Sequence, residues 1–272
     1  MAEHLLHSMS HFAEIFTLLL DRRQPKNIVE IGSEYGGSTR ELATYAAKHG
    51  AMLHVIDPAP KVDPQIALAE FAGSWRFFRE KSVDVLPGLA GDIFFVDGDH
   101  NYWTVITELK TIYSTNPEAW VVLHDVGTPC DRRDHYYAPD QIPAEHRHPY
   151  SYEYGVDLKT GELRYRSGFW GVGEFAIALE AGTPKNGVLT AIEDFLAAHT
   201  ELGYSSIPLI FGLGVITPLK YADFVKTTLR PYQGPLCVAL EHNRLVLFND
   251  WLHLRRTFIR RCINRLLNVF GL

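Results

Sequence analysis

The chain has 272 residues, 46% of them hydrophobic and 21% charged, so it holds enough apolar side chains for a full core and is not globally disordered. Its formal net charge of −6 lacks the basic excess that a nucleic-acid-binding protein usually shows. The charge is uneven, because five arginines and no acid follow Asp250.

Cysteine usage and the N-terminal segment both indicate a cytoplasmic protein. Cys130, Cys237 and Cys262 lie far apart and form no CxxC pair, which argues against a disulfide framework and a structural zinc site. The first residues lack the basic start and unbroken apolar run of a signal peptide. The longest apolar stretch, residues 207–219, contains two prolines and is too short to cross a bilayer.

The first half of the chain alternates short β-rich runs with helical segments. After an amphipathic helix expected over residues 3–20, strands are expected at 27–31, 52–57, 75–82, 92–97 and 119–125, and helices at 38–49, 65–73 and 102–114. The strands are continuous apolar runs, as expected where both faces of a sheet are covered. This pattern predicts a Rossmann-like α/β fold with a doubly wound, mostly parallel sheet.

The second half is less regular. Residues 127–168 are rich in Pro, Asp, His, Arg and Tyr without sustained periodicity. A loop of this length is typical of a substrate lid, and a folded insertion that contacts another subunit is the equal alternative. Regular segments follow at 170–181 and 187–199, an antiparallel hairpin at 204–217, and a helix-prone tail. We divide the chain into an N-terminal helix (1–24), an α/β domain (25–217, with the insertion 127–168) and a helical C-terminal extension (218–272).

A glycine-containing turn joins the first strand of the α/β domain to the next helix. The segment VEIGSEYGGST (29–39) lacks GxGxxG spacing, so the fingerprint of a dinucleotide diphosphate is absent. Glu30 precedes the turn, and a carboxylate there suits a cationic or amine-bearing ligand. Asp57 ends the second strand, where α/β folds place a carboxylate on ribose hydroxyls. These features predict a nucleoside cofactor.

Acids and histidines follow two further strands. Asp97, Asp99 and His100 end the fourth strand, and His124 and Asp125 end the fifth. The carboxyl ends of these strands meet near the topological switch point of a doubly wound sheet. Ionisable groups gathered there need compensation, which a divalent cation supplies. Two carboxylates and an imidazole suit Mg²⁺ or Mn²⁺.

These motifs carry a resemblance to a known family. VEIGSEYGGST, DIFFVDGDHNY and VVLHD, followed by WGVGEF, AIEDFLAAH and FGLGVI, resemble the class I, metal-dependent sugar O-methyltransferases of the macrocin and mycinamicin type and the related proteins called cephalosporin hydroxylases. The resemblance covers about residues 25–217. It implies that the glycine turn binds S-adenosylmethionine.

The resemblance assigns roles by position. It implies cofactor contacts at Glu30, Gly32, Ser33, Tyr35, Ser38, Asp57, Ser82 and Asp97. It also implies a metal site of Asp97, His124 and Asp125, and His100 as the general base. Asp99 is expected either to orient His100 or to bind a sugar hydroxyl. One position departs from the family, because His124 stands where an acid is usual. This leaves the metal open between Mg²⁺ and Mn²⁺. It also leaves His124 open as a ligand, as an imidazole that supports the ligands, or as a catalytic imidazole.

The expected function is methyl transfer to a sugar hydroxyl of a glycan, polysaccharide or glycoside. A catechol-type phenol O-methyltransferase would also use a divalent metal ion to bind its acceptor hydroxyls, and it stays an alternative. A non-catalytic protein that binds S-adenosylmethionine or a glycan is disfavoured by the constellation of Asp97, His100 and Asp125. A dinucleotide oxidoreductase is disfavoured by the missing GxGxxG.

The C-terminal tail is predicted to be an amphipathic helix with a basic side. It could pack on the domain, join subunits of a homo-oligomer or make peripheral contact with an anionic membrane. The saccharide acceptor, rather than nucleic acid, is the expected partner.

Overall fold

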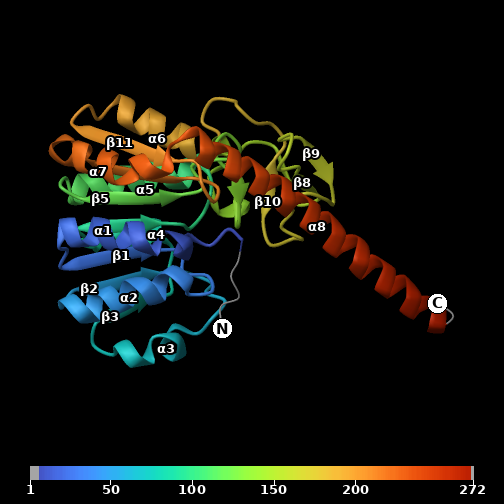
Figure 1. Cartoon of the computed structure of the whole chain (residues 1–272), viewed down its shortest axis with the longest axis horizontal. Helices are drawn as coiled ribbons and strands as arrows, with labels where there is room; N and C mark the ends of the chain where they lie inside the picture. The colour runs from blue at the N-terminus through green and yellow to red at the C-terminus, as the bar shows by residue number, and fades with distance from the viewer. Residues whose placement is uncertain (1–5, 271–272) are drawn as a thin grey trace.

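A seven-stranded sheet with helices on both faces forms the body of the molecule (Figure 1). This computed structural model describes residues 6–270, and of residues 256–270 the helical backbone alone. The strand order is β11-β12-β5-β4-β1-β2-β3. The strands are β1 (Asn27–Ile31), β2 (Met52–Ile56), β3 (Trp75–Phe78), β4 (Ile93–Val96), β5 (Trp120–His124), β11 (Leu202–Ile207) and β12 (Leu213–Pro218). Strands β1 to β5 pair in parallel, and β12 pairs antiparallel with both β5 and β11, which confirms the predicted fold class.

Helices cover the two faces of the sheet and create two separate cores. They are α1 (Ala13–Arg23), α2 (Gly37–His49), α3 (Pro64–Ala67), α4 (Ser82–Val85), α5 (Tyr102–Thr115), α6 (Val188–Ala197), α7 (Ala222–Leu229) and α8 (Pro235–Phe270). Side chains alternate along the strands, so Ile28 and Phe95 pack with α1, α2 and α7, whereas Val29 and Phe94 pack with α5 and α6. We call the sheet with these five helices the α/β body.

The strand order reverses between β1 and β4, which lie side by side in the centre of the sheet. The first connection leads from β1 by α2 to β2 on one side, and β4 leads by α5 to β5 on the other. The loops after β1 and β4 therefore diverge at their carboxyl ends, where doubly wound folds bind ligands.

The N-terminal helix differs from the prediction of 3–20. A 3₁₀ turn at Met9–Phe12 precedes α1, which begins at Ala13, and residues 1–5 lie outside the described residues. Phe16 of α1 is 1% exposed, and its ring meets Phe95 edge-on with centroids 4.7 Å apart. Helix α1 is thus an integral layer of the α/β body.

Three other boundaries were predicted wrongly. The strand expected at 75–82 ends at Phe78, because a polar turn follows and Ser82 begins α4. The helix expected at 65–73 breaks after α3, where the Trp75 indole donates to the carbonyl of Leu68. Regular structure at 170–181 is confined to β10 (Ala176–Ala178).

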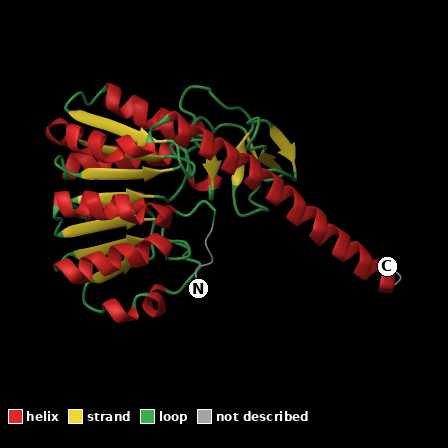
Figure 2. Ribbon diagram, viewed as in Figure 1, coloured by secondary structure: helices red, strands yellow, loops and turns green. Residues whose placement is uncertain are grey.

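The insertion 127–168 lies beyond the carboxyl ends of the main strands (Figure 2). It is less loop-like than predicted. Its strands β6 (His135–Tyr136) and β7 (Tyr150–Ser151) flank β10 in a small antiparallel sheet, and β8 (Tyr154–Val156) pairs with β9 (Leu163–Tyr165). The insertion is therefore held in place beside the predicted site.

Helix α8 crosses the α/β body and then continues away from it (Figure 1). The predicted helix is confirmed for the backbone. The predicted basic and apolar sides, which include Arg256, Arg260, Arg261, Arg265, Phe258, Ile259, Leu266 and Phe270, concern side chains outside the described residues. In the part of the chain that the structure describes, no helix is long and apolar enough to cross a membrane.

Replacing Phe16 tests whether α1 belongs to the core. We expect Phe16→Ala to lower the free energy of unfolding by about 3–5 kcal/mol, because it leaves a cavity against Phe95. Leu18 lies on the same helix and is 44% exposed. We therefore expect Leu18→Ala to change stability by less than about 0.5 kcal/mol in the same urea titration. Equal effects would mean that α1 is an appendage.

Candidate active site

The glycine turn after β1 brings two backbone segments into direct contact. Gly32 has φ +85°, and a Cβ atom there would lie 2.1 Å from the carbonyl oxygen of Asp97 at the end of β4. Only glycine fits this approach. Gly36, with φ +76°, is the N-cap of α2. The turn and the end of β4 therefore form one continuous edge of the site.

Glu30 lies beneath this turn with one carboxylate oxygen unsatisfied. It is fully buried, and Ser38 Oγ donates to its Oε1 at 2.6 Å. Oε2 has no hydrogen-bond partner among the described residues. Burial raises the pKa of Glu30 to about 7, against the lowering effect of the Ser38 and Thr39 hydroxyls. An unpaired buried acceptor beside the turn fits a ligand that carries an amine.

Asp57 fixes the shape of the turn. Its Oδ2 accepts from the backbone N–H groups of Ser33 and Glu34, both at 2.9 Å, and from Ser33 Oγ at 2.8 Å. Its Oδ1 accepts from the backbone N–H of Ala59 at 2.8 Å. These four bonds match the capacity of a carboxylate. A ribose contact stays a prediction, and it requires the exchange of one of these bonds.

Two further predicted cofactor contacts differ in their surroundings. Tyr35 is 44% exposed at the tip of the turn. Ser82 is buried and donates to Glu108 Oε1 of α5 at 2.5 Å. Burial raises the pKa of Glu108 to about 8. Sequence reasoning missed Glu108, although an acid on the apolar face of the helix at 102–114 was a signal.

Asp97, His124 and Asp125 come together as predicted, and each offers a ligand atom within 4.8 Å of the others. His124 Nδ1 lies 3.0 Å from Asp97 Oδ1 and 3.6 Å from Asp125 Oδ2. Its Nε2 lies 2.8 Å from the carbonyl oxygen of Ile210. Because a carbonyl only accepts, Nε2 must be the donor, and Nδ1 is the nitrogen aimed at the carboxylates. This arrangement is common for histidines that bind metal ions.

The charged groups of the cluster shift the pKa values of His124 and Asp125. Burial alone lowers the pKa of His124, but the carboxylates of Asp97 and Asp125 raise it to about 9. Burial opposes ionisation of Asp125, but the imidazoles of His124 and His100 hold the pKa of that carboxyl below its usual value. A proton on His124 Nδ1 therefore occupies the place that a cation would take. A divalent ion at these three side chains must displace it.

Asp125 has the left-handed backbone conformation, with φ +58°. A non-glycine residue pays about 1–2 kcal/mol for this, and surrounding contacts must hold it there. The turn directs its carboxylate to two imidazoles. His100 Nδ1 lies 3.1 Å from Asp125 Oδ2. If Nδ1 donates to this carboxylate, Nε2 keeps the lone pair that a general base needs.

Asp99 has a different set of partners. Its carboxylate accepts from Asn101 Nδ2 at 2.6 Å, from Thr104 Oγ1 at 3.3 Å and from the backbone N–H of Tyr137 at 3.2 Å. These bonds join the start of α5 to the insertion. The carboxylate that pairs with His100 is that of Asp125, so the geometry favours Asp125 for the orienting role expected of Asp99.

The loop between β11 and β12 supplies the carbonyl oxygen of Ile210 that binds His124 Nε2. Ile210 and Phe211 both have positive φ, at +52° and +62°. Their backbone N–H groups donate to the two carboxylate oxygens of Glu241 on α8, at 2.9 and 3.0 Å. Glu241 is itself paired with Arg244 at 2.6 Å. Sequence reasoning missed this support, for which the sequence carries no local signal.

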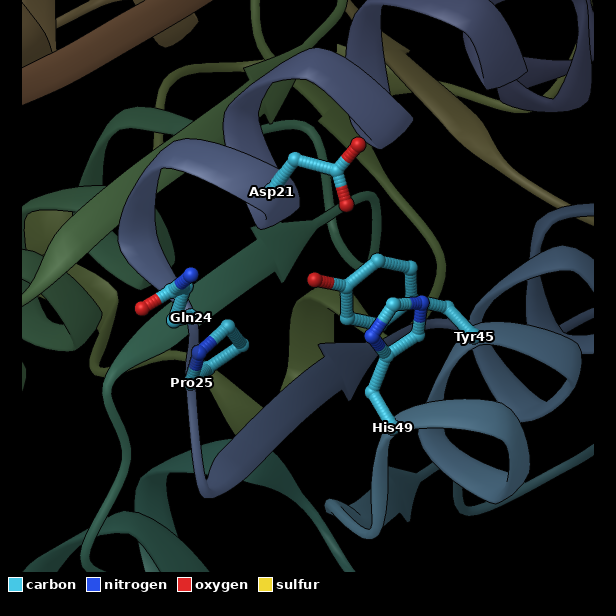
Figure 3. Close-up of a pocket in the computed structure, with 5 residues that line it drawn as sticks. All are labelled: Asp21, Gln24, Pro25, Tyr45 and His49. Atoms are coloured by element: carbon cyan, nitrogen blue, oxygen red, sulfur yellow. The ribbon is translucent and has the colours of Figure 1, made fainter.

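A pocket at the other end of β1 contains none of these residues. It is lined by Asp21 and Gln24 of the α1 end, by Pro25, and by Tyr45 and His49 of α2 (Figure 3). The rings of Tyr45 and His49 stack with centroids 4.1 Å apart. This hollow lies before β1 begins, whereas the predicted residues follow the strand ends.

Gly32→Ala tests the contact between the turn and β4. We expect it to lower the free energy of unfolding by about 3 kcal/mol or more, because strain from positive φ adds to a backbone clash. Gly50 also has positive φ, but nothing in the described part of the chain lies within 4 Å of its Cβ position. Gly50→Ala should cost about 1–2 kcal/mol in the same urea titration. Equal losses would contradict a role for close approach.

Metal binding at His124 should depend on pH. Since the His124 pKa is about 9, an entering ion must displace one proton below that pH. We expect Mn²⁺ affinity to rise about tenfold per pH unit between pH 7 and 8. Calorimetry in buffers of different ionisation enthalpy measures the proton released. His199, which pairs with Glu201 at 2.9 Å far along the chain, gives the control His199→Gln. A pH-independent affinity would exclude His124 as a ligand.

Comparisons with known proteins give matches to methyltransferases. No curated protein matches the chain significantly. Similar solved structures include a methyltransferase of Podospora anserina bound to S-adenosylhomocysteine (16% identity over 78% of this chain and 80% of that chain, TM-score 0.47). Another is an O-methyltransferase of Streptomyces achromogenes involved in tomaymycin synthesis, in complex with S-adenosylmethionine (18% identity over 78% of this chain and 82% of that chain, TM-score 0.47). A third is a putative caffeoyl-CoA O-methyltransferase of Staphylococcus aureus (14% identity over 76% of this chain and 83% of that chain, TM-score 0.45).

A family model described as a methyltransferase domain matches residues 29–126. The matched residues run from β1 to the end of β5. They include the glycine turn, Asp57, Asp97, His100 and Asp125. This segment of the chain is therefore similar to a methyltransferase domain.

Proposed function

We propose that the chain is an S-adenosylmethionine-dependent O-methyltransferase that acts on a saccharide hydroxyl with a divalent metal ion and His100 as general base. One observation carries the proposal. The His100–Asp125 pair and the cluster of Asp97, His124 and Asp125 share a carboxylate at the end of β5, next to the glycine turn.

The turn has features that fit S-adenosylmethionine. Gly32 lets the turn pack directly against the end of β4, and Glu30 Oε2 is a buried acceptor that lacks a described partner. The amine of a methionine moiety would supply the missing donor. When bound, S-adenosylmethionine supplies a methyl group already activated by its sulfonium. The chain's own residues must then align an acceptor and remove its proton.

Asp97, His124 and Asp125 fit a divalent ion because they present two carboxylates and an oriented imidazole nitrogen. When bound, Mg²⁺ or Mn²⁺ would supply Lewis-acid polarisation that lowers the pKa of an acceptor hydroxyl. These three side chains would hold the ion.

His100 Nε2 takes the acceptor's proton in the proposed step. The hydroxyl oxygen forms its bond to the methyl carbon as the carbon–sulfur bond breaks, and that bond's electron pair stays on sulfur. The products are a methyl ether and S-adenosylhomocysteine. Asp125 holds the imidazole through Nδ1 and stabilises the positive charge that develops on it.

Aromatic rings around His100 support a saccharide acceptor. Tyr137 of the insertion is 46% exposed, and its ring centroid lies 5.9 Å from that of His100 and 5.9 Å from that of Phe175. Exposed aromatic faces suit sugar rings. The pKa of Tyr137 is raised by burial of its hydroxyl and by the carboxylates of Glu34, Asp125 and Asp97. Surroundings rich in carboxylates suit a neutral polyol.

The segment before β10 is linked to the loop after β2. Lys61 Nζ lies 3.3 Å from Glu174 Oε1, and the backbone N–H of Lys61 donates to the carbonyl of Glu34 at 2.8 Å. Both side chains of the ion pair are exposed, so the link adds little stability. It is weak enough to open for entry of the cofactor and the acceptor.

His100→Gln tests the base. We expect kcat to fall about 10²- to 10⁴-fold, and the acid limb of the pH–rate profile to disappear, with S-adenosylmethionine affinity unchanged in calorimetry. The matched control is His242→Gln, an exposed histidine on α8 that should leave both quantities unchanged. An unaltered pH profile in His100→Gln would rule out His100 as the base.

Asp97→Ala tests the metal role against a panel of glycosides, polysaccharides and catechols, with methyl transfer followed by mass spectrometry. We expect transfer to a saccharide hydroxyl by the native protein, and none by Asp97→Ala, while binding of S-adenosylmethionine persists. Joint loss of both functions would contradict the metal role. Methylation of catechols alone would replace the saccharide assignment by a phenol one, and failure to bind S-adenosylmethionine would overturn the proposed function.

A further inference from the structure

Helix α8 carries an exposed row of large apolar side chains. Its five members are Leu236 (71% exposed), Leu240 (53%), Leu247 (70%), Trp251 (44%) and Leu254 (66%), and we call them the apolar stripe. They recur at intervals of three, four and seven residues, which places them on one narrow face of a helix. Scattered exposed leucines are ordinary, but a row of five large apolar side chains on one helix face, interrupted by the exposed Asn243, indicates a binding surface.

The other face of α8 is already occupied by the α/β body. Leu245 and Phe248 are buried in a cluster with Leu158 and Phe211. Glu241, which holds the β11–β12 loop, lies on this same side. The apolar stripe therefore points away from the body, along a helix that continues beyond it (Figure 1).

Charge identifies the occupant of this surface. Five arginines and no acid follow Asp250 in the sequence. Arg255, which is described, lies over the Trp251 ring at 5.2 Å, beside the apolar stripe. An exposed apolar stripe followed in the sequence by an arginine-rich stretch without acids fits the boundary of an anionic lipid layer.

The α8 helix of a second copy fits this charge poorly. Glu241 and Asp250 are the two acids of α8. Glu241 is paired with Arg244 at 2.6 Å, and Asp250 with Lys159 at 2.6 Å. A partner α8 would thus oppose basic segments without free acids of its own, whereas lipid phosphates supply the missing negative charge.

We propose that α8 lies in the plane of an anionic membrane surface, with the apolar stripe in the boundary between headgroups and acyl chains. The α/β body then sits on the water side, because its contacts use the opposite face of the helix. This inference is independent of methyl transfer and goes beyond the proposed function.

Co-sedimentation of the full chain with vesicles tests the proposal. We expect at least about tenfold tighter binding to vesicles of phosphatidylcholine with phosphatidylglycerol than to phosphatidylcholine alone. Raising the salt to about 1 M should weaken binding, because it shortens the screening length from about 8 to about 3 Å. Binding without preference for the anionic lipid, or no binding at all, would overturn the proposal.

Two substitutions separate the stripe from the rest of the helix. Leu247→Asp and Leu254→Asp should each weaken vesicle binding about tenfold or more, because each removes a leucine from the apolar boundary. Val238 is 54% exposed on the opposite side of α8, so Val238→Asp is the matched control and should bind within about twofold of the native chain. Thermal midpoints show that each variant is folded.

Light scattering tests whether a second copy of the chain covers the apolar stripe. We expect the same molar mass for the native chain and for Leu247→Asp in the absence of vesicles. A native dimer that Leu247→Asp dissociates would assign the apolar stripe to a second copy of the chain and would overturn the membrane proposal.

Discussion

The hydrogen bond from His124 Nε2 to the carbonyl oxygen of Ile210 is the constraint on which the site depends. It decides which imidazole nitrogen faces Asp97 and Asp125. With Nε2 engaged, Nδ1 lies between the two carboxylates, and Asp125 in turn reaches His100. Rotation of this one ring would remove Nδ1 from both carboxylates. The site is therefore organised through the carbonyl of a strained loop rather than through the strand ends alone.

That loop is held by the segment that sequence reasoning treated as a tail. Ile210 and Phe211 keep positive φ because Glu241 of α8 accepts from both of their N–H groups. Phe211 also packs with Phe248 of the same helix. Helix α8 thus connects the surface that carries the apolar stripe to the position of His124. A partner that shifted α8 would act on the cluster of Asp97, His124 and Asp125 through this loop, without touching either carboxylate.

Topology explains which parts of the site the sequence could reveal. Strand β1 was predicted to the residue, and the ends of β4 and β5 were found because parallel strands bring their carboxyl ends to one edge. Asp97, His124 and Asp125 met for that reason. The bond from Ile210 to Glu241 joins residues 31 positions apart through one side chain, and no periodicity encodes it. The same holds for the pairing of Ser82 with Glu108 and for the bonds that Asp99 makes to the insertion.

The structure also changes the reason for expecting a metal ion. Sequence reasoning held that buried acids at two strand ends need a cation, but a protonated His124 already compensates them, since Asp97 and Asp125 raise its pKa to about 9. An acid at this position would leave three carboxylates facing one another without metal. With histidine there, a proton and a divalent ion become alternative occupants of the same place. Asp125 stays ionised with either, so His100 keeps its orienting carboxylate whether or not metal is bound.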